Sequence, residues 1–237
     1  MRPYQVLLFD VDDTLLDFQA AEQVALQVAF REQQLPLTKR VARRYHVNNQ
    51  LAWQNIEKGR ATREQWLIWR FAQTLVECQL SGNPTALDQT FRKSIAQQHQ
   101  RLGASLEVVQ VLSQQGYSLQ IVSNGVGKTQ RKRLAEAKLL PYFEKFFISG
   151  DMGVQKPDPR FFDFVFQANP EVSKEQFVII GDSLTSDIQG GKQSGIDTVY
   201  LQPKQLGEQT VTSTFWIQQL TELPQLLATK SNQMNQC

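Results

Sequence analysis

The short apolar run Val6–Phe9 ends in two aspartates, Asp10 and Asp12, and this junction constrains the fold more than any other stretch of the chain. A short apolar run closed by polar residues is typical of a strand that is buried on both faces of a parallel sheet. Side chains two residues apart in an extended chain point the same way, so both carboxylates are expected to reach one site. Carboxylates held close together must share a proton, bind a cation, or do both.

Further short apolar runs predict additional strands. They lie at residues 118–122, 145–148, 177–180 and 198–201. Helical patterns separate them, at residues 106–115, 128–137, 159–167 and 184–194. Alternation of strand and helix predicts a parallel sheet with right-handed crossovers and helices on both faces. We therefore expect an α/β fold with a Rossmann-like, doubly wound parallel sheet.

Residues 17–100 interrupt this alternation, because they contain no convincing strand. Helical periodicity indicates four helices there, at residues 20–33, 38–57, 62–80 and 85–100. The chain is thus expected to form a Rossmann-like core from residues 1–16 and 101–237, with a helical cap domain inserted at 17–100. An insertion at this point is expected to lie over the carboxyl ends of the strands, where it acts as a lid over a substrate.

Polar residues follow three more of the predicted strands. They are Ser123 and Asn124 after the second, Lys156 beyond the third, and Asp182 and Asp187 after the fourth. Ligands of open parallel sheets bind at the carboxyl ends of the strands, so these groups are expected to converge with Asp10 and Asp12. Carboxylates, a hydroxyl and a lysine together suit a phosphate and a metal ion.

Composition argues against several other classes of protein. A net charge of +2 offers no strong attraction to a nucleic-acid polymer or a membrane, and no apolar run approaches the length of a membrane span. The two cysteines, Cys78 and Cys237, are not expected to pair, which fits a reducing compartment. We expect a cytoplasmic protein that is a monomer or a weak homodimer.

Basic residues of the predicted helices are expected to be ordinary solvated surface. They are Arg40, Arg43 and Arg44 in one cluster and Lys128, Arg131, Lys132 and Arg133 in another. Solvated surface is likewise expected for Lys58 and Arg70, with a cap contact to phosphate or sugar as the alternative.

The four motifs, in this order, resemble those of the haloacid dehalogenase superfamily of phosphohydrolases. The matching segments are DVDDT at 10–14, SNG at 123–125, Lys156 with Pro157, and GDSLTSD at 181–187. The resemblance covers nearly the whole chain, and the insertion is similar to the helical cap of one subclass of that family.

The resemblance implies a role for each catalytic residue. Asp10 is implied as the nucleophile that forms an aspartyl-phosphate, and Asp12 as the general acid and base. Ser123 and the backbone N–H of Asn124 are implied to bind phosphate oxygens, and Lys156 to hold negative charge beside Asp10.

The resemblance also implies a Mg²⁺ site. Its ligands are expected to be the carboxylates of Asp10 and Asp182 and the backbone carbonyl of Asp12, with Asp187 orienting bound water or the neighbouring lysine. Thr14 is expected to brace the loop or to contact the phosphate.

Asp12 favours a phosphatase over a dehalogenase, because a phosphate ester needs a proton on its leaving oxygen and a halide does not. The segments at 12–18, 123–125 and 181–191 resemble the bacterial 5′-nucleotidase branch that acts on pyrimidine and non-canonical nucleoside monophosphates. We therefore expect a small-molecule phosphate ester as substrate, with Phe18 and Trp53 as surfaces on which a base stacks. A sugar-phosphate phosphatase or a phosphomutase on the same scaffold is the alternative.

Overall fold

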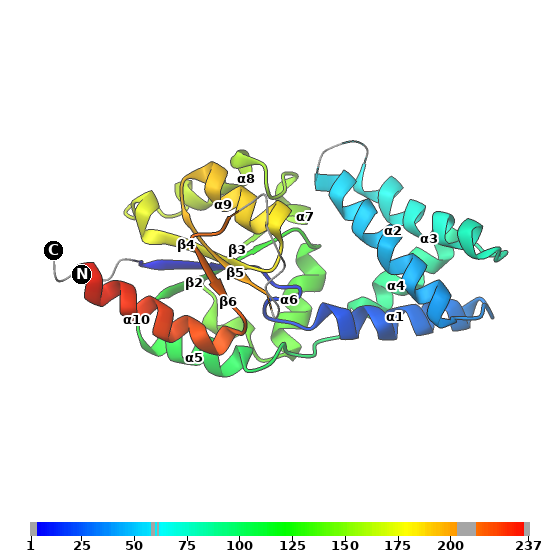
Figure 1. The fold of residues 1–237 in the computed structure, drawn as a ribbon, viewed down its shortest axis with the longest axis horizontal. Helices are drawn as coiled ribbons and strands as arrows, with labels where there is room; N and C mark the ends of the chain where they lie inside the picture. Colours follow the sequence, from blue (N-terminus) through cyan, green and yellow to red (C-terminus); the bar gives the residue numbers. More distant parts are fainter. Residues whose placement is uncertain (1–3, 58–59, 61, 203–211, 235–237) are drawn as a thin grey trace. The chain divides into compact units, whose positions relative to one another are not determined.

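The computed structural model describes residues 4–57, 60, 62–202 and 212–234, which form two compact units (Figure 1). The core unit comprises Met1–Asp17 and His99–Cys237, and the helical unit comprises Phe18–Gln98. The core unit contains apolar clusters on both sides of its sheet, and the helical unit has a cluster of its own. No helix among the described residues is both long and apolar enough to cross a membrane.

The core unit is built on a six-stranded parallel sheet with the strand order β3-β2-β1-β4-β5-β6. Its strands are β1 Val6–Phe9, β2 Ser118–Ser123, β3 Lys145–Ile148, β4 Phe177–Gly181, β5 Asp197–Leu201 and β6 Phe215–Ile217. This confirms the predicted α/β fold. At the centre, Phe9 of β1 is in register with Ile121 of β2 and Ile180 of β4, so the carboxyl ends of these three strands meet.

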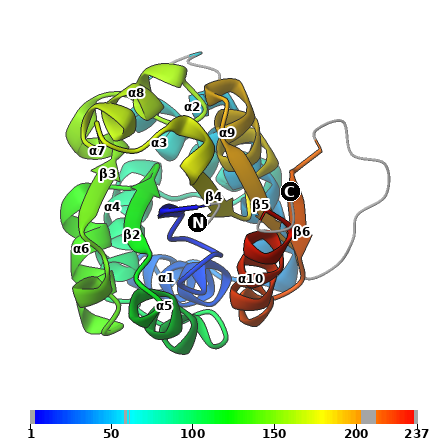
Figure 2. The ribbon, with the colours of Figure 1, turned by 90° about the vertical axis from the view of Figure 1, so that its left-hand side faces the viewer.

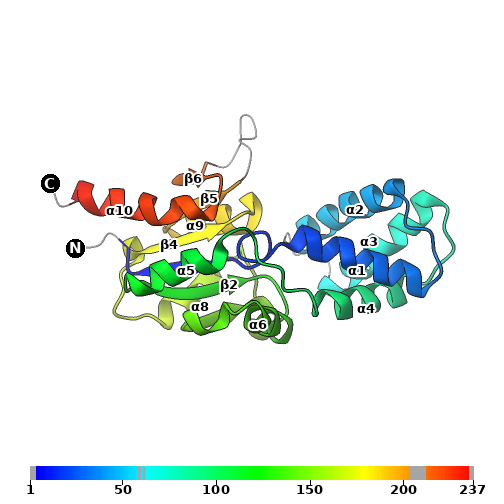
Figure 3. The ribbon, with the colours of Figure 1, turned by 90° about the horizontal axis from the view of Figure 1, so that it is seen from below.

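Helices cover both faces of this sheet, because its central strand is apolar on both (Figure 2). The helices of the core unit are α5 Ser105–Gln114, α6 Gly127–Glu136, α7 Ser149–Met152, α8 Pro159–Gln167, α9 Gln189–Ser194 and α10 Leu223–Met234. Leu7 and Phe9 share an apolar cluster with residues of α5, α6 and α10, and Figure 3 shows α5 and α10 side by side. Val6 and Leu8 face the other way and share a cluster with residues of α8.

The segment after β4 differs from the expected continuous helix at 184–194. It begins with a π-helical turn, Leu184–Ile188, and only then continues as α9. The side chain of Ser183 caps this turn by accepting a hydrogen bond from the backbone N–H of Ser186. The turn buries Asp187 completely, which places a carboxylate beneath the ends of β1 and β4.

Two segments that join the core unit to the inserted one run side by side. The N–H of Asp17 donates to the carbonyl of Gln100 at 2.9 Å, and the N–H of Leu102 donates to the carbonyl of Leu15 at 2.9 Å. The insertion therefore leaves and re-enters the core unit through one hydrogen-bonded pair of segments.

The described residues of the helical unit form four helices around an aromatic centre. They are α1 Phe18–Glu32, α2 Lys39–Glu57, α3 Arg63–Cys78 and α4 Pro84–Ile95. Local signals fix two of the helix starts. Thr62 and Gln65 form a capping box at α3, and the side chain of Asn83 caps α4 with Pro84 in its first turn. Tyr45, Phe71 and Phe91 pack against one another in the interior, which ties α2, α3 and α4 together.

Arg70 is buried in this unit, so the prediction that it is a solvated surface residue is wrong. It is 2% exposed, and its guanidinium donates to Asn49 Oδ1 at 2.6 Å and to Asp88 Oδ1 at 3.0 Å. The same group lies 4.8 Å from the ring centre of Phe91. Lys58, for which the same prediction was made, lies outside the described residues.

Arg70→Ala is expected to lower the free energy of unfolding of the helical unit by about 3–5 kcal/mol, because it leaves Asn49 and Asp88 buried with a lost partner. Arg92→Ala is the matched control, since Arg92 pairs with the same aspartate from a half-exposed position, and its loss should cost about 1 kcal/mol or less. Urea unfolding followed by tryptophan fluorescence measures the difference. Equal effects of the two variants would contradict the prediction.

Candidate active site

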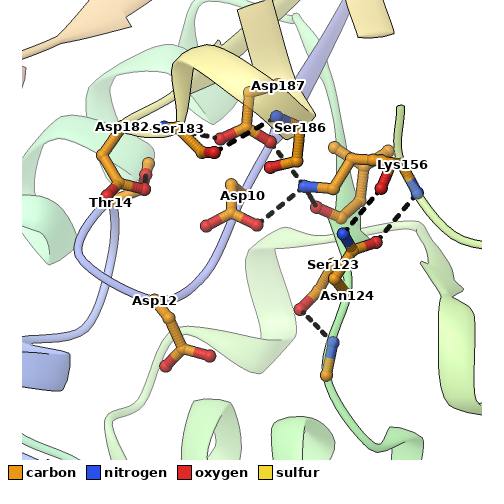
Figure 4. Close-up of polar contacts among 12 residues, drawn as sticks. Asp10, Asp12, Thr14, Ser123, Asn124, Lys156, Asp182, Ser183, Ser186 and Asp187 are labelled. Atoms are coloured by element: carbon orange, nitrogen blue, oxygen red, sulfur yellow. Dashed lines mark hydrogen bonds and ion pairs between the residues drawn. The ribbon is translucent and has the colours of Figure 1, made fainter. Parts of the chain in front are cut away.

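Three carboxylates gather at the carboxyl end of the sheet (Figure 4). Asp10 directly follows β1, Asp182 directly follows β4, and Asp187 comes from the π-helical turn. One oxygen of each lies within 4.8 Å of the others. Gly181 makes the approach possible, because a Cβ atom there would lie 2.2 Å from Asp187 Oδ2. The structure thus brings together three of the four aspartates that the sequence placed at this edge.

Burial makes the charged forms of Asp10 and Asp182 costly. It raises the pKa of Asp10 to about 8, with the charge of Asp187 adding to the effect and that of Lys156 opposing it. Burial and the charge of Asp10 raise the pKa of Asp182 well above its usual range. One lysine therefore supplies too little positive charge to keep all three carboxylates ionised. The cluster's hard oxygen donors and unmet need for positive charge fit a divalent cation such as Mg²⁺.

Lys156 is the positive centre of the site. Its ammonium donates to Asp10 Oδ1 at 2.8 Å, to Asp187 Oδ1 at 2.6 Å and to the carbonyl of Val122 at 2.7 Å. Burial alone would lower the pKa of this lysine, but the charges of Asp10 and Asp187 outweigh burial and raise it. All three donors of the ammonium are used, so the side chain is fixed in position.

Asn124 holds the segment that carries this lysine. Its side-chain amide donates to the carbonyl of Lys156 at 2.9 Å, and its side-chain carbonyl accepts from the N–H of Lys156 at 2.9 Å. Ser123, the last residue of β2, is buried beside it and accepts a hydrogen bond from the N–H of Gly125 at 3.1 Å. The SNG motif therefore joins the ends of β2 and the Lys156 segment through its side chains.

Asp12 lies apart from the acidic cluster. Figure 4 shows its carboxylate turned away from Asp10, although the extended pattern predicted that the two would point the same way. The backbone leaves the strand conformation here, and Asp13 has a φ of 56°. Asp12 instead pairs with Arg133 Nη1 at 2.6 Å and accepts from Gln130 Nε2 at 2.7 Å.

These two residues of α6 were not identified from the sequence. Arg133 was predicted to be solvated, and that prediction is wrong, since its side chain is 1% exposed. The helical spacing does indicate that these two residues are buried. Gln130 and Arg133 lie on the same face of α6 as the buried Leu134 and Ala137, so this face points inward.

The remaining predicted residues have structural partners. Thr14 is fully buried, and its hydroxyl lies 3.5 Å from Asp182 Oδ1, a long hydrogen bond that braces the loop after β1. Phe18 and Trp53 belong to the helical unit. Phe18 packs against its apolar cluster, and the Trp53 ring lies 5.3 Å from the guanidinium of Arg63.

The chain is similar in sequence and fold to several known proteins. The model of the haloacid dehalogenase-like hydrolase family matches residues 7–201. The HAD-hydrolase YfnB of Bacillus subtilis is 40% identical over 228 residues, which cover 96% of this chain and 97% of YfnB. A crystal structure of YfnB bound to magnesium, which reveals interdomain movement, superposes with a TM-score of 0.90 over 95% of this chain and 99% of that one.

Two nucleotidases are also similar over most of their length. The pyrimidine 5′-nucleotidase PynA of Streptococcus pneumoniae is 36% identical over 207 residues, which cover 87% of each chain. The pyrimidine 5′-nucleotidase YjjG of Escherichia coli is 27% identical over 222 residues, which cover 93% of this chain and 96% of YjjG.

Proposed function

The chain belongs to the haloacid dehalogenase-like hydrolases, and on that basis we propose that it is a Mg²⁺-dependent phosphatase that hydrolyses nucleoside monophosphates, with pyrimidine nucleotides as the preferred class. The observation that carries the proposal is the buried contact between Lys156 and Asp10 within an acidic cluster at the ends of β1 and β4. A carboxylate in this setting suits attack on phosphorus, because the adjacent ammonium offsets its repulsion from the phosphate.

The proposed reaction has two steps. Asp10 attacks the phosphorus atom, the ester bond breaks, and the leaving oxygen takes a proton from the Asp12 carboxyl group. Water then attacks the phosphorus of the aspartyl-phosphate, Asp12 accepts the proton of that water, and inorganic phosphate leaves with Asp10 restored. Ser123 donates to a phosphate oxygen, and Lys156 stabilises the charge that develops on the transferring group.

The carboxylates of Asp10 and Asp182 are proposed to hold the Mg²⁺, with the backbone carbonyl of Asp12. Bound there, the ion would supply positive charge that lowers the cost of bringing a phosphate to three clustered carboxylates. Asp187 is proposed to act through its neighbours, because one of its oxygens binds Lys156 and the other accepts from the N–H of Ser183 at 3.1 Å.

One line of support favours a nucleotide over other phosphate esters. The relatives PynA and YjjG are pyrimidine 5′-nucleotidases, and they match this chain over most of its length. Asp12 supports a phosphate ester as substrate, but it does not distinguish a nucleotide from a sugar phosphate. We propose that Phe18 and Trp53 of the helical unit contact the base, by stacking that is worth about 1–3 kcal/mol per base in single-strand binders.

Purified protein with Mg²⁺ is expected to release phosphate from UMP, dUMP and dTMP faster than from purine nucleotides, sugar phosphates or p-nitrophenyl phosphate. EDTA should abolish the release and excess Mg²⁺ restore it, because the acidic cluster lacks positive charge without the ion. A malachite-green phosphate assay over this panel is the measurement. Release from sugar phosphates alone would reject the nucleotide class, and a requirement for a bisphosphate activator would indicate a phosphomutase.

A further inference from the structure

Helix α6 places two buried polar side chains, Gln130 and Arg133, against Asp12. Arg133 Nη1 donates to Asp12 Oδ1 at 2.6 Å, and Gln130 Nε2 donates to Asp12 Oδ2 at 2.7 Å. The same amide nitrogen of Gln130 donates to Ser123 Oγ at 3.1 Å. One glutamine therefore connects the proposed acid and base to the proposed phosphate-binding hydroxyl.

Hydrogen bonding fixes the orientation of this glutamine. Its Oε1 accepts from Arg133 Nη1 at 3.0 Å. A guanidinium can only donate, so the amide oxygen must face Arg133, and the amide nitrogen must face Asp12 and Ser123. Gly125 leaves the room that this arrangement needs, since a Cβ atom there would lie 2.6 Å from Gln130 Nε2.

The orientation of Gln130 decides what the Ser123 hydroxyl can do. Ser123 Oγ accepts from Gln130 Nε2 and from the N–H of Gly125. A hydroxyl has two acceptor positions and one donor, so with both acceptor positions used, its proton is left to donate to a ligand. A phosphate oxygen is such an acceptor.

The arrangement around Asp12 also restricts that side chain. Each of its carboxylate oxygens is held by a different donor of α6, whereas its side chain is 32% exposed on the remaining side. Arg133 is 1% exposed, and a buried charge of this kind is stabilised only by a well-formed pair. A carboxyl group bound on both oxygens keeps one orientation.

We infer that Arg133 and Gln130 are positioning residues that aim the Asp12 carboxyl group at the leaving oxygen and the Ser123 hydroxyl at the phosphate. The inference rests on the proposed phosphatase function, in which Asp12 protonates the leaving group. A positioning role can be distinguished from a purely structural one, because misplacing a general acid slows only those substrates whose leaving group needs a proton.

The test compares two phosphate esters. The ribose oxygen of UMP leaves poorly without a proton, whereas p-nitrophenolate is stable as an anion and needs little help. Values of kcat/KM are measured for both esters with wild type, Gln130→Leu, Arg133→Met and Arg133→Lys. Because kcat/KM ends at the first irreversible step, it includes departure of the leaving group and excludes breakdown of the aspartyl-phosphate.

Gln130→Leu and Arg133→Met are expected to lower the UMP to p-nitrophenyl phosphate ratio of kcat/KM by about 10²-fold, the lower end of general acid catalysis. Arg133→Lys keeps the charge and one donor, and should restore the ratio to within about tenfold of wild type. Lys132→Met, which removes a cation from a half-exposed position on the same helix, is the matched control and should leave the ratio unchanged.

Gln130→Leu and a double variant with Asp12→Asn provide two further tests. If Arg133→Met does not fold, Gln130→Leu alone carries the test, because it removes no charge. In an Asp12→Asn background, adding Gln130→Leu should change the ratio no further, since the group that is aimed has gone. Equal losses on both esters in an active protein would overturn the positioning of Asp12 and leave the proposed function standing. Wild type that hydrolyses neither ester would overturn the proposed function, and the inference with it.

Discussion

Asp10→Asn is expected to lower kcat for phosphate release by about 10⁵–10⁶-fold, the scale on which loss of a catalytic nucleophile is felt. The amide has nearly the same shape, and its oxygen can still accept from Lys156, so the site keeps its form. It lacks the negative charge that attacks phosphorus, however, and forms no aspartyl-phosphate. Steady-state phosphate release from UMP with Mg²⁺ measures the effect.

A matched control shows whether removing any one carboxylate charge lowers activity, or only the one at Asp10. Asp163→Asn makes the same change at an exposed position on α8 and should retain full activity. Activity of Asp10→Asn above about 1% of wild type would show that another group attacks phosphorus, because removing a nucleophile costs far more than that.

The free energy of unfolding should show that Asp10→Asn loses activity without losing its fold. Burial raises the pKa of Asp10 to about 8, so the folded metal-free protein loses stability as pH rises from the usual carboxyl range to about 8, where the unfolded chain ionises this group more readily. This penalty is fully developed above pH 8. Asn carries no such penalty. At pH 9 without metal, the free energy of unfolding of Asp10→Asn should therefore be at least as high as that of wild type. Urea unfolding measures this quantity.

Lys156→Met is expected to lower kcat/KM by at least about 10³-fold, since it removes the positive charge beside the nucleophile. It should also reduce the free energy of unfolding by about 3–5 kcal/mol, because Asp187 then stays fully buried without its ion-pair partner. Phosphate release from UMP and urea unfolding measure the two effects.

Lys192→Met removes an exposed lysine from α9 and serves as the control, with both quantities expected to match wild type. Loss of stability with activity kept within tenfold of wild type would show that Lys156 is needed for the fold and not for the reaction.

The central strands could be predicted from the sequence because their apolar runs match the two-sided burial of a parallel sheet. β1 and β4 lie where the patterns at 6–9 and 177–180 place them. The edge strand β6 and the helix α10 were not predicted. β6 has only three residues, and Trp216 in its middle is exposed, so neither length nor alternation distinguishes it from a loop.

The acidic cluster was predictable for a similar reason, because motif residues that directly follow parallel strands must meet at one edge. The direction of Asp12 was not. It depends on the turn that begins after β1 and on partners from α6, more than a hundred residues away. Charged residues in a helix are usually solvated, so composition alone favoured the wrong answer for Arg133, and only the shared face with Leu134 indicates otherwise.

The paired segments at 15–17 and 100–102 make the inserted helices a replaceable module. Both hydrogen bonds of the junction are made by the backbone, so any sequence that reproduces them can close the same gap in the core. The backbone hydrogen bonds hold the two ends of the insertion together. Closing a flexible loop costs only about 0.6 kcal/mol more for each doubling of its length, so the length of the insertion adds little to the entropy cost of folding the sheet. The helical module can thus diverge, or be exchanged between relatives, while the chemistry at the strand ends is inherited unchanged.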